Sequence, residues 1–241
     1  GDGLIVDIMP YIKSSAPNLL SLIESDPLVE KQLVRDDGSV YLVPWLTTDL
    51  SLLAGEGFAI RQDWLDKFQL SVPKTPDELF DALNTFREQD ANGNGEKDEF
   101  VTGYPAQFNK SAFAFGTTDG FHFTEDGKTV VYGPVTDNYK EWLKWMNKLY
   151  SNNLIDPDYF SGDSDIYMKK AMENRVGLYV DNPAVLGTMV KDGAANGLDI
   201  KWTPMEYMYY NGKSVNYSSA YKRYVQPYGL AVSKDCEDPE R

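Results

Sequence analysis

The segment from Asp90 to Glu99 carries side chains whose types and spacing suit a metal ion. Side-chain oxygens recur at every second position, in Asp90, Asn92 and Asn94. Ca²⁺ takes about six to eight oxygen ligands and tolerates an irregular arrangement of them. The glycine at the sixth position permits a sharp bend, which turns the next carbonyl, that of Glu96, inward. This pattern predicts a Ca²⁺-binding loop.

The end of the loop departs from the EF-hand pattern. An EF-hand loop places a glutamate at its twelfth position, and Val101 stands there in this chain. We therefore expect Asp98 and Glu99 to complete the ligand set by their carboxylates. The alternative interpretation is a polar turn after a helix, because Asn-Gly pairs also form turns.

The elements around this loop can be predicted from local signals. Thr75 is a helix cap, Pro76 suits the first helical position, and Glu78 completes a capping box. Apolar residues at helical spacing then continue the helix as far as the metal loop. A bound cation would thus fix the direction in which the chain leaves this helix.

Helices and strands alternate through the rest of the chain. We expect strands at 58–61, 175–180 and 229–233, and a hairpin at 121–133. Helices are expected at 62–68, 137–150, 164–174 and 183–193, and the second of these has a broad apolar face. Interleaved elements of these lengths predict an α/β fold.

Composition excludes several classes of function. The 241 residues carry a formal net charge of −14, which opposes binding to nucleic acid or to an anionic membrane surface. We find no apolar run long enough to span a bilayer. Aromatic residues make up 13% of the chain, and aromatic faces pack well against the C–H faces of sugars.

Catalytic groups are scarce. His122 is the single histidine and lies in the predicted hairpin, and Cys236 is the single cysteine and sits among acidic residues. An acidic neighbourhood disfavours the thiolate that nucleophilic chemistry requires. The sequence lacks the nucleophile-elbow, phosphate-loop and dinucleotide fingerprints. A carboxylate pair for glycoside hydrolysis stays open as an alternative, because sequence does not give the separation of the two groups.

Several motifs together resemble a known family. They are Phe58-Ala-Ile-Arg-Gln-Asp-Trp-Leu-Asp-Lys-Phe68, Val72-Pro-Lys-Thr-Pro-Asp-Glu-Leu-Phe80, the Asp90–Glu99 loop, Gly133-Pro-Val-Thr-Asp-Asn-Tyr-Lys-Glu141, Leu154-Ile-Asp-Pro157 and the stretch from Gly229 to Glu240. In order and spacing they are similar to the extracellular solute-binding proteins of ABC importers. The most similar branch is the lipoprotein branch for oligosaccharides, which includes the alginate-binding proteins.

The resemblance implies a fold, a metal and a location. It implies two α/β lobes of the periplasmic-binding-protein type II, with helices around a mixed sheet and ligand held between the lobes. It implies one structural Ca²⁺ on Asp90, Asn92, Asn94, the carbonyl of Glu96, Asp98 and Glu99. The full-length protein is expected to be a monomeric, membrane-anchored lipoprotein outside the cytoplasm, at the cell surface or in the periplasm, that delivers a carbohydrate to the permease subunits.

The resemblance also implies a domain division. A lipid-attached leader, an N-terminal part of the first lobe and C-terminal helices are expected in this family, and the sequence contains none of them. We therefore expect a fragment. Residues 1–61 would be a first-lobe remnant with a hinge strand, 62–226 the second lobe, and 227–241 a returning hinge strand with an acidic tail.

Candidate ligand contacts are less strongly indicated. Trp45 follows a proline and could form a sugar platform or pack on the protein. A glycine-rich, uncharged run suggests a cleft wall that includes Tyr104, Gln107 and Phe115. Asp181 ends a predicted buried strand, where it could meet a sugar hydroxyl or cap a helix.

Arg61 could pair with an acidic sugar or with a neighbouring aspartate. From the residues and the resemblance together we predict a non-catalytic binding protein for carbohydrate. A Ca²⁺-containing hydrolase or lyase is the alternative.

Overall fold

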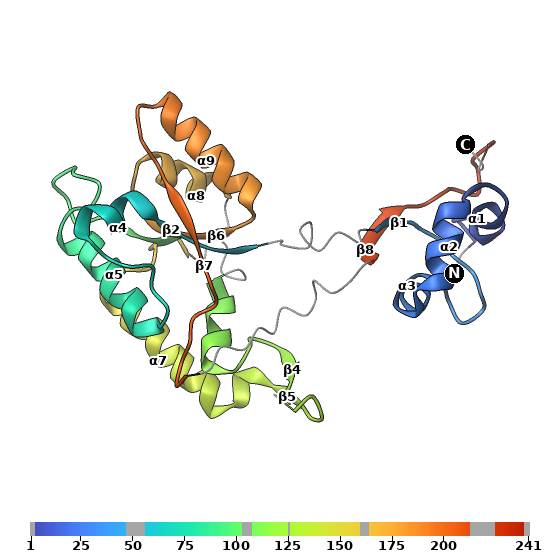
Figure 1. The fold of residues 1–241 in the computed structure, drawn as a ribbon, viewed down its shortest axis with the longest axis horizontal. Coiled ribbons are helices and arrows are strands. Elements are labelled where there is room, and N and C mark those ends of the chain that lie inside the picture. The colour runs from blue at the N-terminus through green and yellow to red at the C-terminus, as the bar shows by residue number, and fades with distance from the viewer. Residues whose placement is uncertain are drawn as a thin grey trace. The chain divides into compact units, whose positions relative to one another are not determined.

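The computed structural model describes residues 3–46, 56–102, 108–124, 126–159, 164–212 and 225–238. The chain divides into two compact units, which are treated separately below (Figure 1). The smaller unit comprises Gly1–Leu53 and Ala220–Arg241, and the larger unit comprises Ala54–Ser219. No helix in the described part of the chain is long and apolar enough to cross a bilayer.

The smaller unit packs three helices beside a strand pair. These are α1 (Met9–Ser15), α2 (Pro17–Ser25) and α3 (Pro27–Leu33), each with a proline in its first turn, where the missing N–H leaves no bond unmade. β1 (Val43–Leu46) pairs antiparallel with β8 (Val225–Leu230). A small core of isoleucine and valine side chains joins the helices. Near the start of this unit, Ile5 forms an isolated antiparallel bridge with Ser233.

The larger unit is built on a mixed four-stranded sheet in the order β3-β6-β2-β7. The strands are β2 (Gly57–Arg61), β3 (Phe100–Thr102), β6 (Val176–Asp181) and β7 (Trp202–Met205). β2 is antiparallel to both of its neighbours, whereas β3 runs parallel to β6. All six residues of β6 are buried, as expected for a strand covered on both faces.

Helices cover both faces of this sheet. On one face, α4 (Gln62–Phe68), α5 (Pro76–Glu88) and α7 (Asp137–Ser151) pack on the alternate residues Phe58, Ile60, Leu178 and Val180. On the other, α8 (Ser164–Met172) and α9 (Pro183–Ala195) lie together and enclose Tyr179 with Met189 (Figure 1). The unit is therefore a three-layer α/β/α structure, and the predicted α/β class is confirmed.

The predicted helix caps are present. Thr75 Oγ1 accepts a hydrogen bond of 3.2 Å from the Glu78 amide at the start of α5, and Thr136 does the same for Tyr139 at the start of α7. Two short 3₁₀ segments, η2 (Asn109–Phe115) and η3 (Gly133–Val135), flank a hairpin of β4 (Phe121–Phe123) and β5 (Val130–Tyr132). After β7, Tyr210 makes an isolated bridge.

Candidate functional site

Three strands of the larger unit meet at one end of its sheet. β2 begins at Gly57, directly opposite Asp181, with which β6 ends. β3 runs parallel to β6, so it also ends at this edge. Ligands of α/β proteins commonly bind outside the carboxyl ends of such strands, where loops leave the sheet. This edge of the sheet is therefore a candidate position for a ligand site.

A pocket of about 430 Å³ lies beside this edge, between α9 and β7. Its walls are largely apolar and include Pro183, Leu186 and Val190 from α9 and Trp202 and Pro204 from β7. The carboxylates of Glu56 and Asp181 also line it. A mostly apolar hollow with a few polar groups has the general character of a small-molecule site.

Asp181 is the predicted ligand residue that the structure brings to this pocket. Its Oδ1 accepts hydrogen bonds from the Asn182 amide at 2.7 Å and from Asn182 Nδ2 at 3.0 Å. Burial raises the pKa of the Asp181 carboxyl, and the nearby Glu56 carboxylate adds to the rise. Asn182, not Asp181, caps α9, since Asn182 Oδ1 accepts from the amides of Ala184 and Val185.

Glu56 forms an ion pair with Lys110 of η2, and both side chains are partly buried. The ammonium group of Lys110 lowers the pKa of Asp181, but burial has the larger effect. The carboxylates of Glu56 and Asp181 and the ammonium group of Lys110 therefore form one cluster of charged groups at the edge of the sheet.

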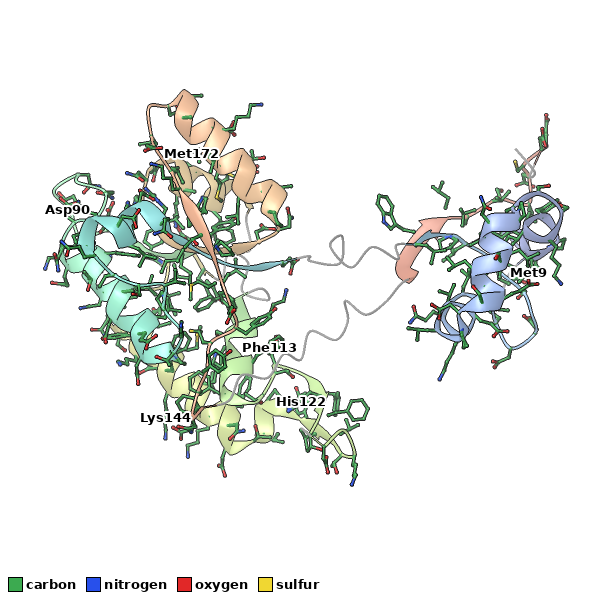
Figure 2. All side chains as sticks on the ribbon, in the orientation of Figure 1. Met9, Asp90, Phe113, His122, Lys144 and Met172 are labelled. Atoms are coloured by element: carbon green, nitrogen blue, oxygen red, sulfur yellow. The ribbon has the colours of Figure 1, made fainter. Side chains whose placement is uncertain are left out.

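The predicted metal loop follows α5 at the periphery of the larger unit, where Figure 2 marks Asp90 far from His122 of the hairpin. Asp90 Oδ1 accepts from the Asn94 amide at 3.0 Å, and Asp90 Oδ2 accepts from the Gly95 amide at 2.8 Å. Gly93 and Gly95 have φ angles of 75° and 88°, which glycine adopts without steric cost. The loop thus curls around its first aspartate as predicted.

The later part of the loop turns its polar groups toward Asp98. Nδ2 of Asn92 lies 3.0 Å and Nδ2 of Asn94 lies 3.3 Å from Asp98 Oδ1. An amide rotated by half a turn exchanges nitrogen for oxygen at the same place, so these side chains can also offer oxygens beside Asp98. The other carboxylate oxygen of Asp98 lies 2.8 Å from Nε of Arg175.

Glu99 is the deeply placed member of the loop, with 1% of its surface exposed. Its carboxylate accepts hydrogen bonds from the amides of Asn92 and Asp98 at 3.0 and 3.2 Å. Burial raises the pKa of Glu99. A buried carboxylate held mainly by amide donors is a group whose charge a cation would stabilise.

The oxygen atoms of the Asp90–Glu99 loop fit a hard cation only if side-chain amide oxygens and backbone carbonyl oxygens are among the ligands. Among the described residues, no three His, Cys, Asp or Glu side chains gather closely enough to hold an ion by themselves. Such a mixed oxygen set is what Ca²⁺ accepts and what softer metals do not prefer.

Two candidate ligand residues are buried. Arg61 is 3% exposed, and its guanidinium donates to both carboxylate oxygens of Asp63 at 2.8 and 2.6 Å and to Asn174 at 2.7 Å. The alternative in which Arg61 pairs with a neighbouring aspartate is thus the one observed. Phe115 is buried in the core, where the centres of its ring and that of Tyr210 lie 4.4 Å apart, and its assignment as a ligand contact stays a prediction.

The remaining candidates divide between the smaller unit and the undescribed segments. Trp45 lies on β1 of the smaller unit with 65% of its surface exposed. Tyr104 and Gln107 lie outside the described residues. Their assignment as ligand contacts stays a prediction.

Sequence reasoning missed Glu56, Lys110 and Trp202. Their positions in the chain are far apart. An ion pair joins Glu56 to Lys110, and Trp202, which pairs with Arg61 at the other end of β2, lines the same pocket as Glu56. A signal for the pocket does exist on α9, where Pro183, Leu186 and Val190 share one face of the helix.

The fold and the relatives define the class of protein. No protein-family model matches the chain. The chain nevertheless has the fold of periplasmic-binding-protein-like solute-binding proteins, and it is homologous to substrate-binding proteins of ABC transporters, so the resemblance is confirmed.

Two curated relatives are similar in sequence. The fructooligosaccharide ABC transporter substrate-binding protein FusA of Streptococcus pneumoniae is 31% identical over 189 residues, which cover 73% of this chain and 35% of FusA. The polygalacturonan/rhamnogalacturonan-binding protein YtcQ of Bacillus subtilis is 29% identical over 183 residues, or 75% of this chain and 35% of YtcQ. The chain thus spans about a third of the length of these relatives.

Solved structures agree with the fold. FusA in complex with kestose matches 74% of this chain and 39% of its own chain, with a TM-score of 0.62 and 31% identity. Another structure of FusA is described as an EF-hand mutant in complex with fructo-nystose. The alginate-binding protein AlgQ2 without calcium ion matches 99% of this chain and 49% of its own chain, with a TM-score of 0.76 and 22% identity.

Proposed function

We propose that this chain belongs to the substrate-binding component of an ABC importer and binds an oligosaccharide without converting it. The observation that carries the proposal is the 31% identity to a fructooligosaccharide-binding relative over 73% of the chain. The apolar pocket beside the strand-end edge supports it, because apolar walls with a few hydrogen-bonding groups suit the two faces of a sugar ring.

Calorimetric titration against a panel of oligosaccharides tests the binding, and chromatography of the same samples tests for products. Saturable binding with unchanged sugar is the expected result. Release of shorter sugars would instead favour the hydrolase or lyase alternative. Absence of binding to every sugar in the panel would contradict the proposal.

Trp45 is a second candidate contact in this function. Its exposed ring can stack on a sugar, and little packing would be lost by removing it. Trp45→Ala should weaken sugar binding while leaving the unfolding midpoint nearly unchanged. Equal affinity of the variant and the wild type would exclude the platform role.

We also propose that the Asp90–Glu99 loop holds one structural Ca²⁺. The ligands would be the side chains of Asp90, Asn92, Asn94, Asp98 and Glu99, with the carbonyl of Glu96. The buried carboxylate of Glu99 and the curled backbone support this assignment. When bound, the ion would stabilise the exit of α5 and the start of β3, and these residues would hold it in place.

Delivery to the permease and location outside the cytoplasm complete the proposal. FusA is named as an ABC-transporter substrate-binding protein, and a further relative, LipO of Bacillus subtilis, is named as a lipoprotein. A membrane-anchored, monomeric receptor that hands its ligand to permease subunits agrees with these names. Lipid labelling and cell fractionation of the natural host would test the anchor.

A further inference from the structure

The charge balance around the pocket is unequal. Glu56 and Asp181 each contribute a carboxylate to its lining, and Lys110 pairs with Glu56. Of the described residues that line the pocket, none is lysine, arginine or histidine. Counted over the described residues, Glu56, Asp181 and Lys110 therefore carry one negative charge in excess beside a largely apolar hollow.

Arg61 is a cation close to the pocket, and it is already engaged. It ends β2 at the opposite end from Glu56, where it pairs with the pocket residue Trp202 and its guanidinium lies 5.9 Å from the centre of the Trp202 ring. Its guanidinium is held by Asp63 and Asn174 and lies over the ring of Trp64 at 4.2 Å. Moving this buried group toward a ligand would break three hydrogen bonds at once, so it offers no counter-ion to the pocket.

The polar groups that line the pocket suit hydroxyls. Trp202 lines the pocket, and its buried Nε1 has no acceptor among the described residues. Asp181 is an acceptor at the end of β6. A sugar hydroxyl can donate a hydrogen bond to a carboxylate such as that of Asp181 and can accept one from an N–H group. The apolar side chains of α9 can cover the C–H face of the same sugar.

We propose that this pocket takes an uncharged sugar unit and rejects a uronate. The inference rests on the carbohydrate-binding function proposed above and narrows its ligand class. A uronate carboxylate placed here would lose water and face like charges without a cation to compensate, which opposes binding. A neutral sugar meets no such penalty.

Paired titrations test this selection. The purified protein is titrated with neutral fructo-, xylo- and galacto-oligosaccharides and with galacturonate and alginate oligomers of equal length, at one pH and one ionic strength. We expect a neutral sugar to bind at least about tenfold more tightly than any uronate. Equal or tighter binding of a uronate would overturn the inference while leaving carbohydrate binding intact. Failure of both classes to bind would overturn the proposed function as well.

Variants locate the effect. Glu56→Gln removes one carboxylate and leaves Lys110 without that partner, so the preference for the neutral sugar should fall by about tenfold. Asp181→Asn should also lower the preference for the neutral sugar, while its amide keeps an oxygen that can accept a hydrogen bond. The control is Asp199→Asn, which makes the same change in net charge at an exposed residue outside the pocket.

Unchanged selectivity in the control is expected. If the control shifted selectivity as much as the pocket variants, overall charge would be the cause and the inference would fail. Unchanged selectivity in both pocket variants would also overturn it. Thermal unfolding of each variant confirms that the titrated protein is folded.

Discussion

Gly57 and Asp181 lie directly opposite each other across β2 and β6. One residue opens its strand and the other closes its strand, so the backbone register alone carries the carboxylate to the edge of the sheet. A shift of one residue would turn Asp181 to the opposite face of the sheet. The position of this carboxylate is therefore as well determined as the strand pairing itself.

The buried carboxylate of Asp181 should make stability depend on pH. Burial raises the pKa of Asp181 above its ordinary value of 3.8, so the folded protein binds the proton more tightly than the unfolded chain does. The carboxylate therefore lowers stability above the raised pKa, and this loss disappears as the pH falls toward 3.8. Asp181→Asn should raise the unfolding midpoint at neutral pH, and the gain should vanish in acid.

Urea unfolding at neutral and acid pH measures this difference. Asp199→Asn provides the comparison, because an exposed ion pair contributes little to stability. A gain that stays constant across the pH range would show that the charge of Asp181 is not its cause.

Arg61→Lys should destabilise the protein and leave sugar affinity unchanged. A lysine keeps the charge but cannot reproduce the forked contact with Asp63, the bond to Asn174 and the packing on Trp64. The expected loss is about 2 kcal/mol, or a fall in midpoint of roughly 4–8 °C. Arg35→Lys, at an exposed residue of the smaller unit, is the control. A drop in sugar affinity without a drop in stability would return Arg61 to the ligand site.

Gly177→Ala should be destabilising because β6 passes close to two aromatic rings. An added Cβ would lie 2.9 Å from Phe86 Cδ2 and 3.1 Å from Trp64 Cζ3. Overpacking of this kind costs about 1–3 kcal/mol. Gly187→Ala is the matched control, since its Cβ would meet nothing within 4 Å and alanine favours the helix by roughly 0.5–1 kcal/mol. Calorimetry should thus find midpoint shifts of opposite sign, and equal shifts would contradict this account of the core.

Calcium should raise the unfolding midpoint, and chelation by EDTA should lower it again. An ion bound only by the folded state adds about 2.7 kcal/mol at a concentration one hundred times its dissociation constant. Asp90→Ala should lose the response because Asp90 organises the loop. Glu141→Ala, at a partly exposed residue of α7 outside the loop, should retain it. No response to Ca²⁺ in the wild type, with no metal found by elemental analysis, would refute the assignment.

Local signals made much of the larger unit predictable. The caps at Thr75 and Thr136 and the apolar stripe of α7 are encoded within a few residues, and the helices form where these signals lie. The glycines of the Asp90–Glu99 loop likewise predicted its curled backbone. Such features depend on neighbouring residues, so one sequence suffices to find them.

The pocket could not be predicted in the same way. Lys110 meets Glu56, and Trp202 pairs with Arg61, only because the chain folds back on itself. Phe115 shows the converse problem, since an uncharged aromatic run suits a cleft wall and a core equally well. Strand order and register decide whether such a run lines a cleft or packs in the core, and the spacing of neighbouring residues predicts neither of them.

The two units differ in how the chain supplies them. The larger unit is one uninterrupted segment, whereas the smaller unit joins Gly1–Leu53 to Ala220–Arg241 through the pairing of β1 with β8. On a ribosome, every strand of the larger unit's sheet therefore emerges before the partner of β1 does. Because domains fold as units, β1 can pair with β8 only after the whole intervening segment has been synthesised. The part of this chain that is synthesised first is thus the part that completes its fold last.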